Sequence, residues 1–345
     1  MDRVKKIDVH DLEHILTNTK DLWEEVRDKT IFITGGTGFF GKWLLYSFKY
    51  INEKLSLNAS LNVLSRQPDD FLRAHPAFQR PDIHFIKGDI SSFTFPETAV
   101  DYIIHAATDA SASLNMARPI LMYDVIVNGT RHVLELARAK NVKAVLHTSS
   151  GAVYGQQPPD ITHISEDSKA SPDIYGKDAA YGEGKRVAEM LSAFYYHHYG
   201  VQSKIARCFA FTGPYLPLDA HFAIGNFIND TINDKPIVVN GDGTPYRSYM
   251  YASDLVIWLW VILLKGVSCR PYNVGSDEDI TVAGLAGQIA KTGKKSTSVR
   301  ILGVPNENSL PKRYVPCVNR AKNELNLKIK VSLEEAIQKT INFYL

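Results

Sequence analysis

Cysteine is scarce in this chain of 345 residues, and neither sign of charge is in excess. The three cysteines (Cys208, Cys269 and Cys317) lie far apart, which argues against a disulfide framework and favours a reducing compartment. The 39 Lys and Arg residues balance 37 Asp and Glu residues, so no basic surplus points to nucleic acid and no acidic tail is present.

Long hydrophobic runs are also lacking. The longest, residues 255–264, is too short to cross a bilayer, and the polar N-terminal residues do not resemble a signal peptide. The 11 histidines are scattered without metal-ligand spacing, so we expect no metal site. With 45% hydrophobic residues, the chain has ample material for a core. We therefore expect a cytoplasmic protein that binds neither membrane nor nucleic acid.

From residue 29 onward, short β-branched runs alternate with longer helical stretches. Strands are predicted at residues 31–34, 61–64, 84–86, 102–105, 144–147 and 204–206. Helices are predicted at residues 40–50, 119–140 and 180–199, and then at 222–233, 254–264, 282–291 and 333–343. This alternation predicts an α/β fold with a doubly wound parallel sheet of the Rossmann type, covered on both faces.

Three regions are predicted along the chain. Residues 1–28 form an amphipathic helical extension outside the sheet, and residues 29–213 form a dinucleotide-binding domain. Residues 214–345 form a smaller substrate lobe, from which the chain can return to the first domain.

A glycine-rich turn follows the first predicted strand and opens the first long helix. Gly35, Gly38 and Gly41 allow positive φ, close backbone approach to a pyrophosphate and close packing of helix on strand. Because a strand precedes the turn and a helix follows it, the context is that of a dinucleotide-binding site. We assign Thr37, Phe39 and Phe40 to the same turn.

The second predicted strand ends in Ser65-Arg66, and the first carboxylate after it is Asp69. A carboxylate at the end of this strand would bind the ribose 2′-hydroxyl of NAD, whereas a cation there suits the 2′-phosphate of NADP. Arg66 therefore favours NADP over NAD, unless it is simply a solvated loop residue.

Tyr181 and Lys185 are predicted to lie one turn apart on one face of a helix. An ammonium group near a phenol favours the phenolate, so this spacing predicts that Lys185 lowers the pKa of Tyr181. Upstream, the fifth predicted strand runs into Ser149-Ser150, which places hydroxyl groups at the strand end where ligands bind in such sheets.

With these motifs, the chain resembles the extended short-chain dehydrogenase/reductases, and among them the NAD-dependent epimerase/dehydratase group that acts on nucleotide-sugars. The resemblance extends over residues 30–345. It implies that Tyr181 is the acid/base, that Lys185 lowers its pKa and binds the nicotinamide ribose, and that Ser150 orients the reacting oxygen. It also implies a homodimer, in which the helices at 119–140 and 180–199 form a four-helix bundle.

The resemblance assigns further residues to ligands. The segments implied in cofactor binding contain Asp89, Ile90, His105, Ala106 and Ala107. The residues implied in binding a nucleotide-diphosphate sugar are Asn226, Arg247, Tyr251 and Arg313. Asp219 and His221, in an unusual loop at 216–221, are candidates for contact with the sugar, although such residues more often cap the following helix.

Several positions depart from the family pattern. Sugar 4,6-dehydratases carry an acidic pair after the serine or threonine of the triad, and the decarboxylases carry a glutamate before Val-Tyr-Gly, where this chain has Gly151 and Ala152. Ala210 replaces a usual asparagine, and Cys317 stands where an acidic partner of Arg313 is expected.

These departures favour an enzyme that transiently oxidises a nucleotide-sugar at C4, with NADP or NAD, as a 4-epimerase. An NADPH-dependent 4-ketosugar reductase is the alternative. A dehydratase or decarboxylase, or a silent dinucleotide sensor, fits less well.

Overall fold

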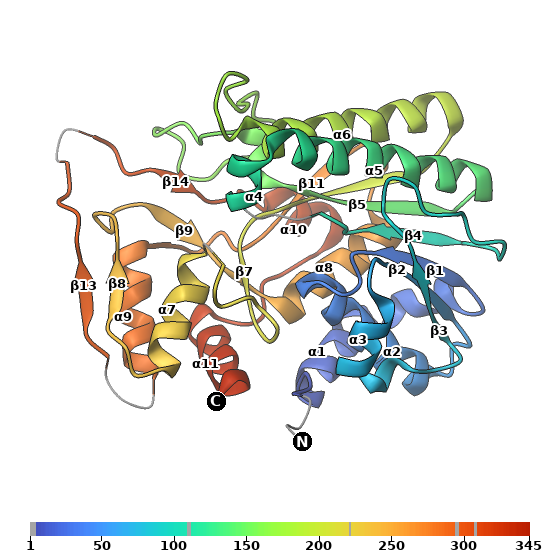
Figure 1. Ribbon diagram of the computed structural model, residues 1–345, viewed down its shortest axis with the longest axis horizontal. Coiled ribbons are helices and arrows are strands. Elements are labelled where there is room, and N and C mark those ends of the chain that lie inside the picture. Colours follow the sequence, from blue (N-terminus) through green and yellow to red (C-terminus); the bar gives the residue numbers. More distant parts are fainter. Residues whose placement is uncertain (1–4, 109–111, 221, 294–296, 307–308) are drawn as a thin grey trace.

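The computed structural model describes residues 5–108, 112–220, 222–293, 297–306 and 309–345 (Figure 1). Its centre is a seven-stranded parallel sheet with the strand order β11-β6-β5-β4-β1-β2-β3. The strands are β1 (Thr30–Thr34), β2 (Ser60–Ser65), β3 (Ile83–Lys87), β4 (Tyr102–His105), β5 (Ala144–Ser150), β6 (Ser203–Cys208) and β11 (Pro271–Val274). Strand order reverses between β1 and β4, which opens a crevice for a ligand at their carboxyl ends. The predicted fold class is confirmed.

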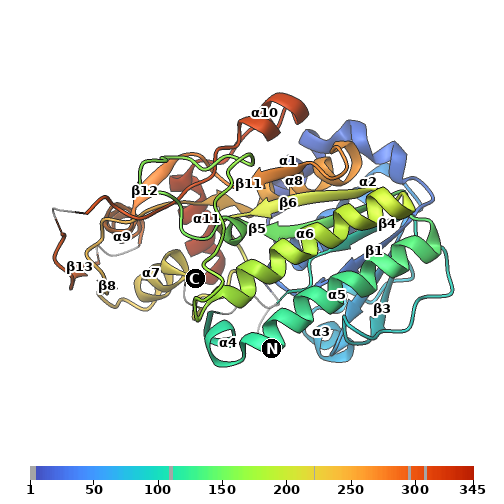
Figure 2. The ribbon, with the colours of Figure 1, turned by 90° about the horizontal axis from the view of Figure 1, so that it is seen from above.

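Helices cover both faces of this sheet. On one face α5 (Pro119–Lys140) and α6 (Ala179–Tyr199) lie side by side, as Figure 2 shows, with the short α4 (Ala112–Ala117) before them. The opposite face is covered by α2 (Phe39–Leu55) and α8 (Ala252–Lys265), with α3 (Pro68–Ala74) at its side. Single-turn 3-10 helices occur at η2 (Pro76–Phe78) and η3 (Gly151–Tyr154).

Helix α8 is apolar because it is enclosed on all sides. Its residues from Ala252 to Leu263 are buried between the sheet, α2 and the N-terminal helix α1 (Val9–Thr19). The one carboxylate in this stretch, Asp254, accepts hydrogen bonds from the backbone N–H groups of Lys330 (2.8 Å) and Val331 (2.9 Å), which compensate its burial.

The N-terminal segment packs onto the outer side of α2 and α8. It consists of α1 and the 3-10 helix η1 (Lys20–Val26), and its Ile15, Trp23 and Val26 are buried in the same hydrophobic core as the sheet. The Trp23 ring meets the Trp260 ring edge-on, with 4.9 Å between the ring centroids. These residues therefore complete the core on this side of the molecule.

A smaller lobe lies at the other end of the molecule. Its helices are α7 (Ala223–Ile232), α9 (Val282–Thr292) and α11 (Leu333–Tyr344), and α10 (Asn319–Leu325) lies nearer the large sheet. Its small sheets join β7 (Phe211–Thr212) to β10 (Met250–Tyr251), β8 (Ile237–Val239) to β13 (Val299–Ile301), and β9 (Tyr246–Ser248) to both β12 (Asp279–Thr281) and β14 (Arg313–Tyr314). Since α8 and β11 come after β8, the chain returns to the large sheet from this lobe.

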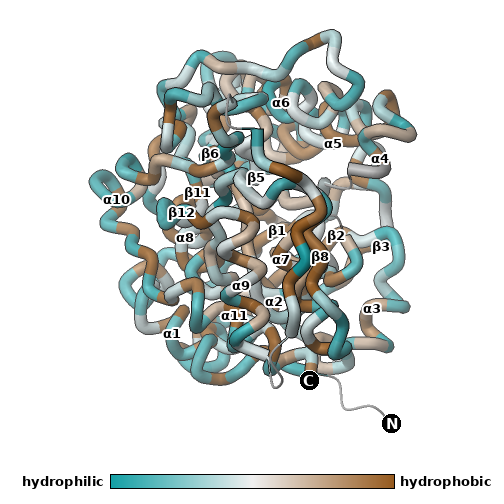
Figure 3. Tube along the Cα trace, turned by 90° about the vertical axis from the view of Figure 1, so that its left-hand side faces the viewer, coloured by the Kyte–Doolittle hydropathy of each residue, from teal (hydrophilic) through white to brown (hydrophobic). Residues whose placement is uncertain are grey.

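The small lobe has a hydrophobic core of its own, in which Ile228, Ile289 and Ile337 of three helices meet. Figure 3 shows a run of hydrophobic residues around β8. Val238 of β8 and Ile301 of the paired strand β13 are exposed there. Within the described ranges, no helix is long and apolar enough to span a membrane, and no three His, Cys, Asp or Glu side chains are grouped to hold a metal ion.

Candidate active site

The glycine turn lies between β1 and α2, against the end of β4. Gly35 has a φ of +73°, and a Cβ atom there would lie 2.5 Å from the Ala106 carbonyl oxygen. A Cβ atom at Gly41 would lie 2.3 Å from the Gly35 oxygen, so both positions require glycine. Helix α2 begins after Gly38 without a side-chain cap, which leaves its N-terminal N–H groups directed at the crevice. This turn fits the pyrophosphate of a dinucleotide.

Phe39 and Phe40, which we assigned to the glycine turn, also pack in the interior of the protein. The Phe40 ring meets the Phe211 ring edge-on at 5.1 Å, and Phe39 packs against the cores of both lobes. Thr37, in the turn itself, is half-buried.

A hydrogen-bonded histidine supports the segment after β4. His105 lies between the hydroxyl groups of Thr34 (2.8 Å from Nδ1) and Thr130 (3.1 Å from Nε2), and the Thr34 oxygen also accepts from the Ala107 N–H (3.1 Å). Burial, aided by the charge of Lys185, lowers the pKa of His105 to about 3, so the ring is neutral. The network fixes Ala106 and Ala107 beside the glycine turn.

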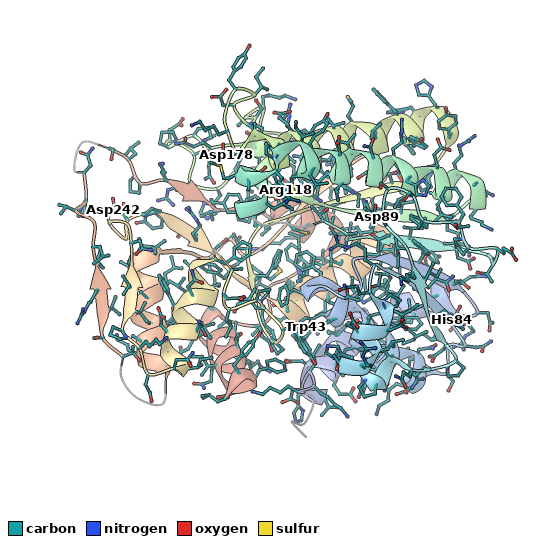
Figure 4. The ribbon with its side chains drawn as sticks, viewed as in Figure 1. Trp43, His84, Asp89, Arg118, Asp178 and Asp242 are labelled. Atoms are coloured by element: carbon teal, nitrogen blue, oxygen red, sulfur yellow. The ribbon has the colours of Figure 1, made fainter. Side chains whose placement is uncertain are left out.

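Two residues predicted at the adenosine end are exposed. Arg66, after β2, lies near enough to Asp89 that its charge contributes to a lowered pKa of that carboxyl. The larger cause is Ser91, whose N–H (3.0 Å) and hydroxyl (2.6 Å) both donate to Asp89. Ile90, by contrast, is buried beneath Gly129 of α5. Asp89 lies just after the end of β3, and Figure 4 labels it on the same side of the molecule as that strand.

Ser150, Tyr181 and Lys185 come together at the end of β5. The Ser150 hydroxyl lies beside the Tyr181 phenol, whose pKa it acts to lower. The neighbouring Ser149 donates instead to Glu189 (2.5 Å), which leaves Ser150 as the serine beside Tyr181. Tyr181 is held at the start of α6 because its N–H donates to the Asn115 side chain (3.1 Å), which in turn donates to the Asp178 carbonyl. Figure 4 labels Asp178 where the chain enters α6.

Lys185 is buried under Tyr181 and makes its hydrogen bonds elsewhere. Its ammonium donates to the Thr108 hydroxyl (2.9 Å) and the Thr148 carbonyl (2.8 Å), 6.0 Å from the centre of the Tyr181 ring. Burial lowers the pKa of Lys185 to about 8.

The pKa of Tyr181 is raised to about 12, first by burial, while the hydrogen bond with Ser150 acts in the opposite direction. This differs from our prediction that Lys185 lowers this pKa. The physical reason is that the desolvation of the phenolate outweighs the attraction of an ammonium group that is turned toward Thr108 and Thr148.

Tyr314 is a residue at this site that sequence reasoning missed. It lies on β14, and its ring packs against Phe209 with 4.7 Å between centroids. Its hydroxyl lies 2.6 Å from the position that a Cβ atom at Gly151 would occupy, and it is within reach of the Ser150 hydroxyl. The one sequence feature that could have indicated a place for Tyr314 at this site is its position next to Arg313, a predicted substrate residue.

The two arginines predicted to bind the substrate lie on adjacent strands. Arg247 of β9 lies opposite Tyr314 and donates to the Tyr246 carbonyl (2.8 Å). Arg313 stacks on the Tyr246 ring at 4.0 Å and pairs with Asp279 at 2.5 Å. Asp279 is therefore the acidic partner of Arg313, in place of the acidic residue that the family pattern has where this chain has Cys317.

Two other predicted substrate residues are not gathered at Ser150. Tyr251 is buried in the core, where its hydroxyl donates to Asp11 (2.7 Å), so it is unable to bind a ligand; this prediction was wrong. No sequence pattern indicates that Asp11, on a distant helix, accepts a hydrogen bond from this hydroxyl. Asn226 is exposed on α7, and with its amide suitably oriented it donates to the carbonyls of Ala220 (2.6 Å) and Leu218 (3.2 Å). It thus holds the preceding loop at residues 216–220.

Within that loop, Asp219 is exposed, and His221 lies outside the described residues. A ligand role for either residue stays a prediction.

Comparison with known proteins agrees with this geometry. A family model described as "NAD dependent epimerase/dehydratase family" matches residues 31–275. UDP-glucuronic acid decarboxylase 6 of Arabidopsis thaliana is 30% identical over 324 residues, which cover 93% of this chain and 90% of that protein.

Two solved structures share the fold. The UDP-glucuronic acid 4-epimerase of Bacillus cereus, in complex with UDP-glucuronic acid and NAD, superposes with a TM-score of 0.77 at 21% identity, over 91% of this chain and 98% of that one. The UDP-N-acetylglucosamine 4-epimerase of Methanobrevibacter ruminantium superposes with a TM-score of 0.80 at 19% identity, over 92% and 98%.

Proposed function

Since the chain belongs to the NAD dependent epimerase/dehydratase family, we propose that it interconverts nucleotide-diphosphate sugars that differ at C4. The family makes it an NAD-dependent nucleotide-sugar enzyme; the position of the reaction and its epimerising outcome are our proposal. The grouping of Ser150, Tyr181 and Lys185 at the crevice supports it, because transient oxidation of a secondary alcohol needs one acid/base beside the cofactor.

The observation that carries the choice of reaction is the environment of Gly151. Elimination or decarboxylation calls for a further acid or base beside the triad, and Gly151 and Ala152 have no side chain that could act as one. The space next to Gly151 is taken by the Tyr314 hydroxyl. This supports a 4-epimerase over a decarboxylase, although the decarboxylase of Arabidopsis is similar along most of the chain.

In this proposal the three side chains divide the proton chemistry. Tyr181 takes the proton of the C4 hydroxyl while the sugar is oxidised, and returns it to the same oxygen when the sugar is reduced from its other face. Ser150 donates to the C4 oxygen and fixes its distance from the Tyr181 phenol. The Lys185 ammonium, fixed by Thr108 and Thr148, offers a positive charge beneath the phenol. A bound nicotinamide dinucleotide supplies the hydride chemistry.

We also propose that NADP(H) binds at least as tightly as NAD(H). Support comes from Arg66, which is exposed directly after β2, while the first carboxylate beyond it, Asp69, already belongs to α3. A guanidinium there can offer paired N–H donors to a 2′-phosphate. The same residue favours the alternative function, an NADPH-dependent 4-ketosugar reductase.

One assay tests these functions against each other. The purified protein is incubated with UDP-, dTDP-, CDP- and GDP-sugars, without added cofactor and with NAD⁺ or NADPH, and the products are identified by NMR. We expect an epimer pair to equilibrate with no net consumption of cofactor. Consumption of one NADPH per sugar would identify a reductase, and release of CO₂ from UDP-glucuronic acid would identify a decarboxylase. Tight dinucleotide binding without any turnover would identify a silent sensor.

A homodimer is the final part of the proposal. The outward faces of α5 and α6 expose large hydrophobic residues that a monomer would leave in water, including Ile120 (76% exposed), Met190 and Phe194. Figure 1 shows these helices along the upper edge of the molecule and Figure 2 shows them side by side, where a second copy could pack its own pair against them.

A further inference from the structure

Helix α6 begins without a cap from the residue that precedes it. The N–H groups in the first turn of a helix have no partner inside the helix, and the side chain before the helix usually accepts from one of them. Asp178, which precedes α6, makes no such hydrogen bond. Tyr181 is the third residue of the helix, so its N–H belongs to this group. The backbone of the proposed acid/base therefore needs a hydrogen-bond acceptor from another part of the chain.

Asn115 of α4 supplies this acceptor. Its side-chain oxygen accepts from the Tyr181 N–H (3.1 Å), and its side-chain nitrogen donates to the Asp178 carbonyl (2.8 Å). The two bonds determine which way the amide group points, because its oxygen faces a donor and its nitrogen faces an acceptor. Asn115 is buried, and α4 lies at the end of the helix pair where α6 begins (Figures 1 and 2). An amide from α4 thus takes the place of the missing cap.

The stretch of chain that carries Asn115 makes two further contacts with this part of α6. Leu114, the residue before Asn115, and the Tyr181 ring pack against the same hydrophobic cluster between α5 and α6. Thr108, nearer to β4 in this stretch, accepts from the Lys185 ammonium (2.9 Å). The segment between β4 and α5 therefore contacts both residues of α6 on which the proposed proton transfer depends.

We propose that Asn115 is a positioning residue for Tyr181: its amide fixes the first turn of α6 and so keeps the Tyr181 phenol in place for proton transfer. This inference rests on the proposed role of Tyr181 as the acid/base. The ends of helices fray, and Tyr181 lies in the first turn. Because the hydroxyl is at the far end of the side chain, a small tilt of this turn moves the hydroxyl further than the backbone. A general acid/base acts only within about 2.6–3.2 Å of its partner, so such motion reduces turnover.

The first test follows residue 181 without any substrate. A 3,5-difluorotyrosine is incorporated at position 181 of the full chain, and its ¹⁹F spectrum is recorded with NAD⁺ present and absent. We expect sharp signals from the parent and broadened or additional signals from Asn115→Ala, because the uncapped first turn samples several arrangements. Hydrogen exchange of the backbone at the start of α6 should accelerate roughly fivefold in the same variant, in line with the loss of one helix cap.

Ser332→Ala is the matched control. It removes the cap of α11, where the Ser332 hydroxyl accepts from the Glu335 N–H (3.2 Å), and α11 belongs to the core of the small lobe. This variant should accelerate hydrogen exchange at the start of α11, and it should leave both the ¹⁹F spectrum of residue 181 and kcat unchanged.

Turnover of the epimer pair gives a second readout. In Asn115→Ala we expect kcat to fall roughly tenfold to a hundredfold, with little change in KM or in NAD⁺ affinity, because placement of the acid/base is lost and binding groups are not. Asn115→Ala combined with Tyr181→Phe should have no lower turnover than Tyr181→Phe alone, since the effect passes through the Tyr181 hydroxyl. A change that merely loosened the fold would reduce this residual turnover further.

The two readouts separate this inference from the proposed function. An unchanged ¹⁹F spectrum in Asn115→Ala would overturn the role of Asn115, and so would a further loss of turnover in the double variant. If the parent protein turns over no nucleotide-sugar, the proposed function fails, and the ¹⁹F and hydrogen-exchange measurements still decide whether Asn115 holds Tyr181 in place.

Discussion

Tyr181 carries a single hydroxyl group on which the proposed proton transfer depends. We expect Tyr181→Phe to keep dinucleotide binding and to lose at least 99.9% of turnover, roughly the thousandfold contribution of a general acid/base. The ring stays, so the packing at the start of α6 is unchanged. Turnover and dinucleotide affinity should be measured in parallel, with Tyr196→Phe on the same helix as the control. Activity near that of the parent in Tyr181→Phe would place the acid/base elsewhere.

Arg66 is exposed, so its effect on cofactor choice should be moderate and sensitive to salt. We expect Arg66→Ala to weaken NADP(H) binding roughly tenfold at low salt, with little change for NAD(H), because only NADP(H) carries the 2′-phosphate. Titration calorimetry at two salt concentrations measures both affinities. The nearby Arg73→Ala is the control, since Arg73 already pairs with Asp70 on α3. A parent protein that strongly prefers NAD(H) would contradict this prediction.

His147 is a buried imidazole whose two ring nitrogens have no hydrogen-bond partner in the described part of the chain. Its pKa lies well below the ordinary 6.5, first because of burial, so the unfolded chain binds a proton below pH 6.5 that the folded chain does not. Stability is therefore lost as pH falls below 6.5.

We expect His147→Leu to remove this acid sensitivity. Relative to the parent, its free energy of unfolding should gain about 2 kcal/mol more at pH 5 than at pH 7.5, from 1.36 kcal/mol per pH unit. Urea unfolding at the two pH values measures the difference. The exposed His198→Leu should show no such gain, and an equal effect of His147→Leu at both pH values would disprove the linkage.

Residue roles were predictable where the contact is local in sequence. The glycine turn could be read directly, because Gly35 and Gly41 constrain one another within seven residues. Tyr251 and Tyr314 could not be placed, because the partners that decide their roles, Asp11 and Gly151, are far away in the chain. The raised pKa of Tyr181 also depends on burial, which spacing along a helix does not reveal.

At the scale of elements, the strands and long helices of the large sheet follow their hydrophobic pattern closely. Strand β4 and helix α5 have the predicted limits, and the other predicted strands and helices are present with ends that differ by a few residues. The short helices α3, α4 and α10, the seventh strand of the large sheet (β11) and the small sheets were not predicted. They are too short for a periodic pattern, and their strands pair with segments from distant parts of the chain.

Helix α1 is attached to the rest of the protein through a buried carboxylate. Asp11 accepts from the Tyr251 hydroxyl (2.7 Å) and from the Lys339 ammonium (2.8 Å). We expect Asp11→Ala to lower the free energy of unfolding by about 2–4 kcal/mol, because it leaves both donors without their acceptor. Urea unfolding measures the loss, and the exposed Asp21→Ala is the matched control. A loss equal to that of the control would mean that α1 is held by its hydrophobic residues alone.

At the scale of the whole molecule, the exposed hydrophobic side chains on α5 and α6 predict the assembly. We expect light scattering at micromolar concentration to give twice the chain mass of 38.6 kDa. Phe194→Asp should shift the mass toward that of the monomer, because a carboxylate would be desolvated in the interface. Val304→Asp, at an exposed position after β13 and outside these helices, should leave the dimer intact. A parent protein with the monomer mass would contradict the prediction.

The bond between Asp11 and Lys339 also bears on the order in which the protein folds as it is synthesised. Helix α1 is synthesised long before its partners on α8 and α11, and the two bonded residues are 328 positions apart. The part of α1 that packs against α8 must therefore stay exposed until α8 has been translated. A ribosome stalled before α8 would carry a nascent chain with Ile15 and Trp23 uncovered, and such a chain should be a substrate for chaperones even when the nucleotide-binding sheet is already formed.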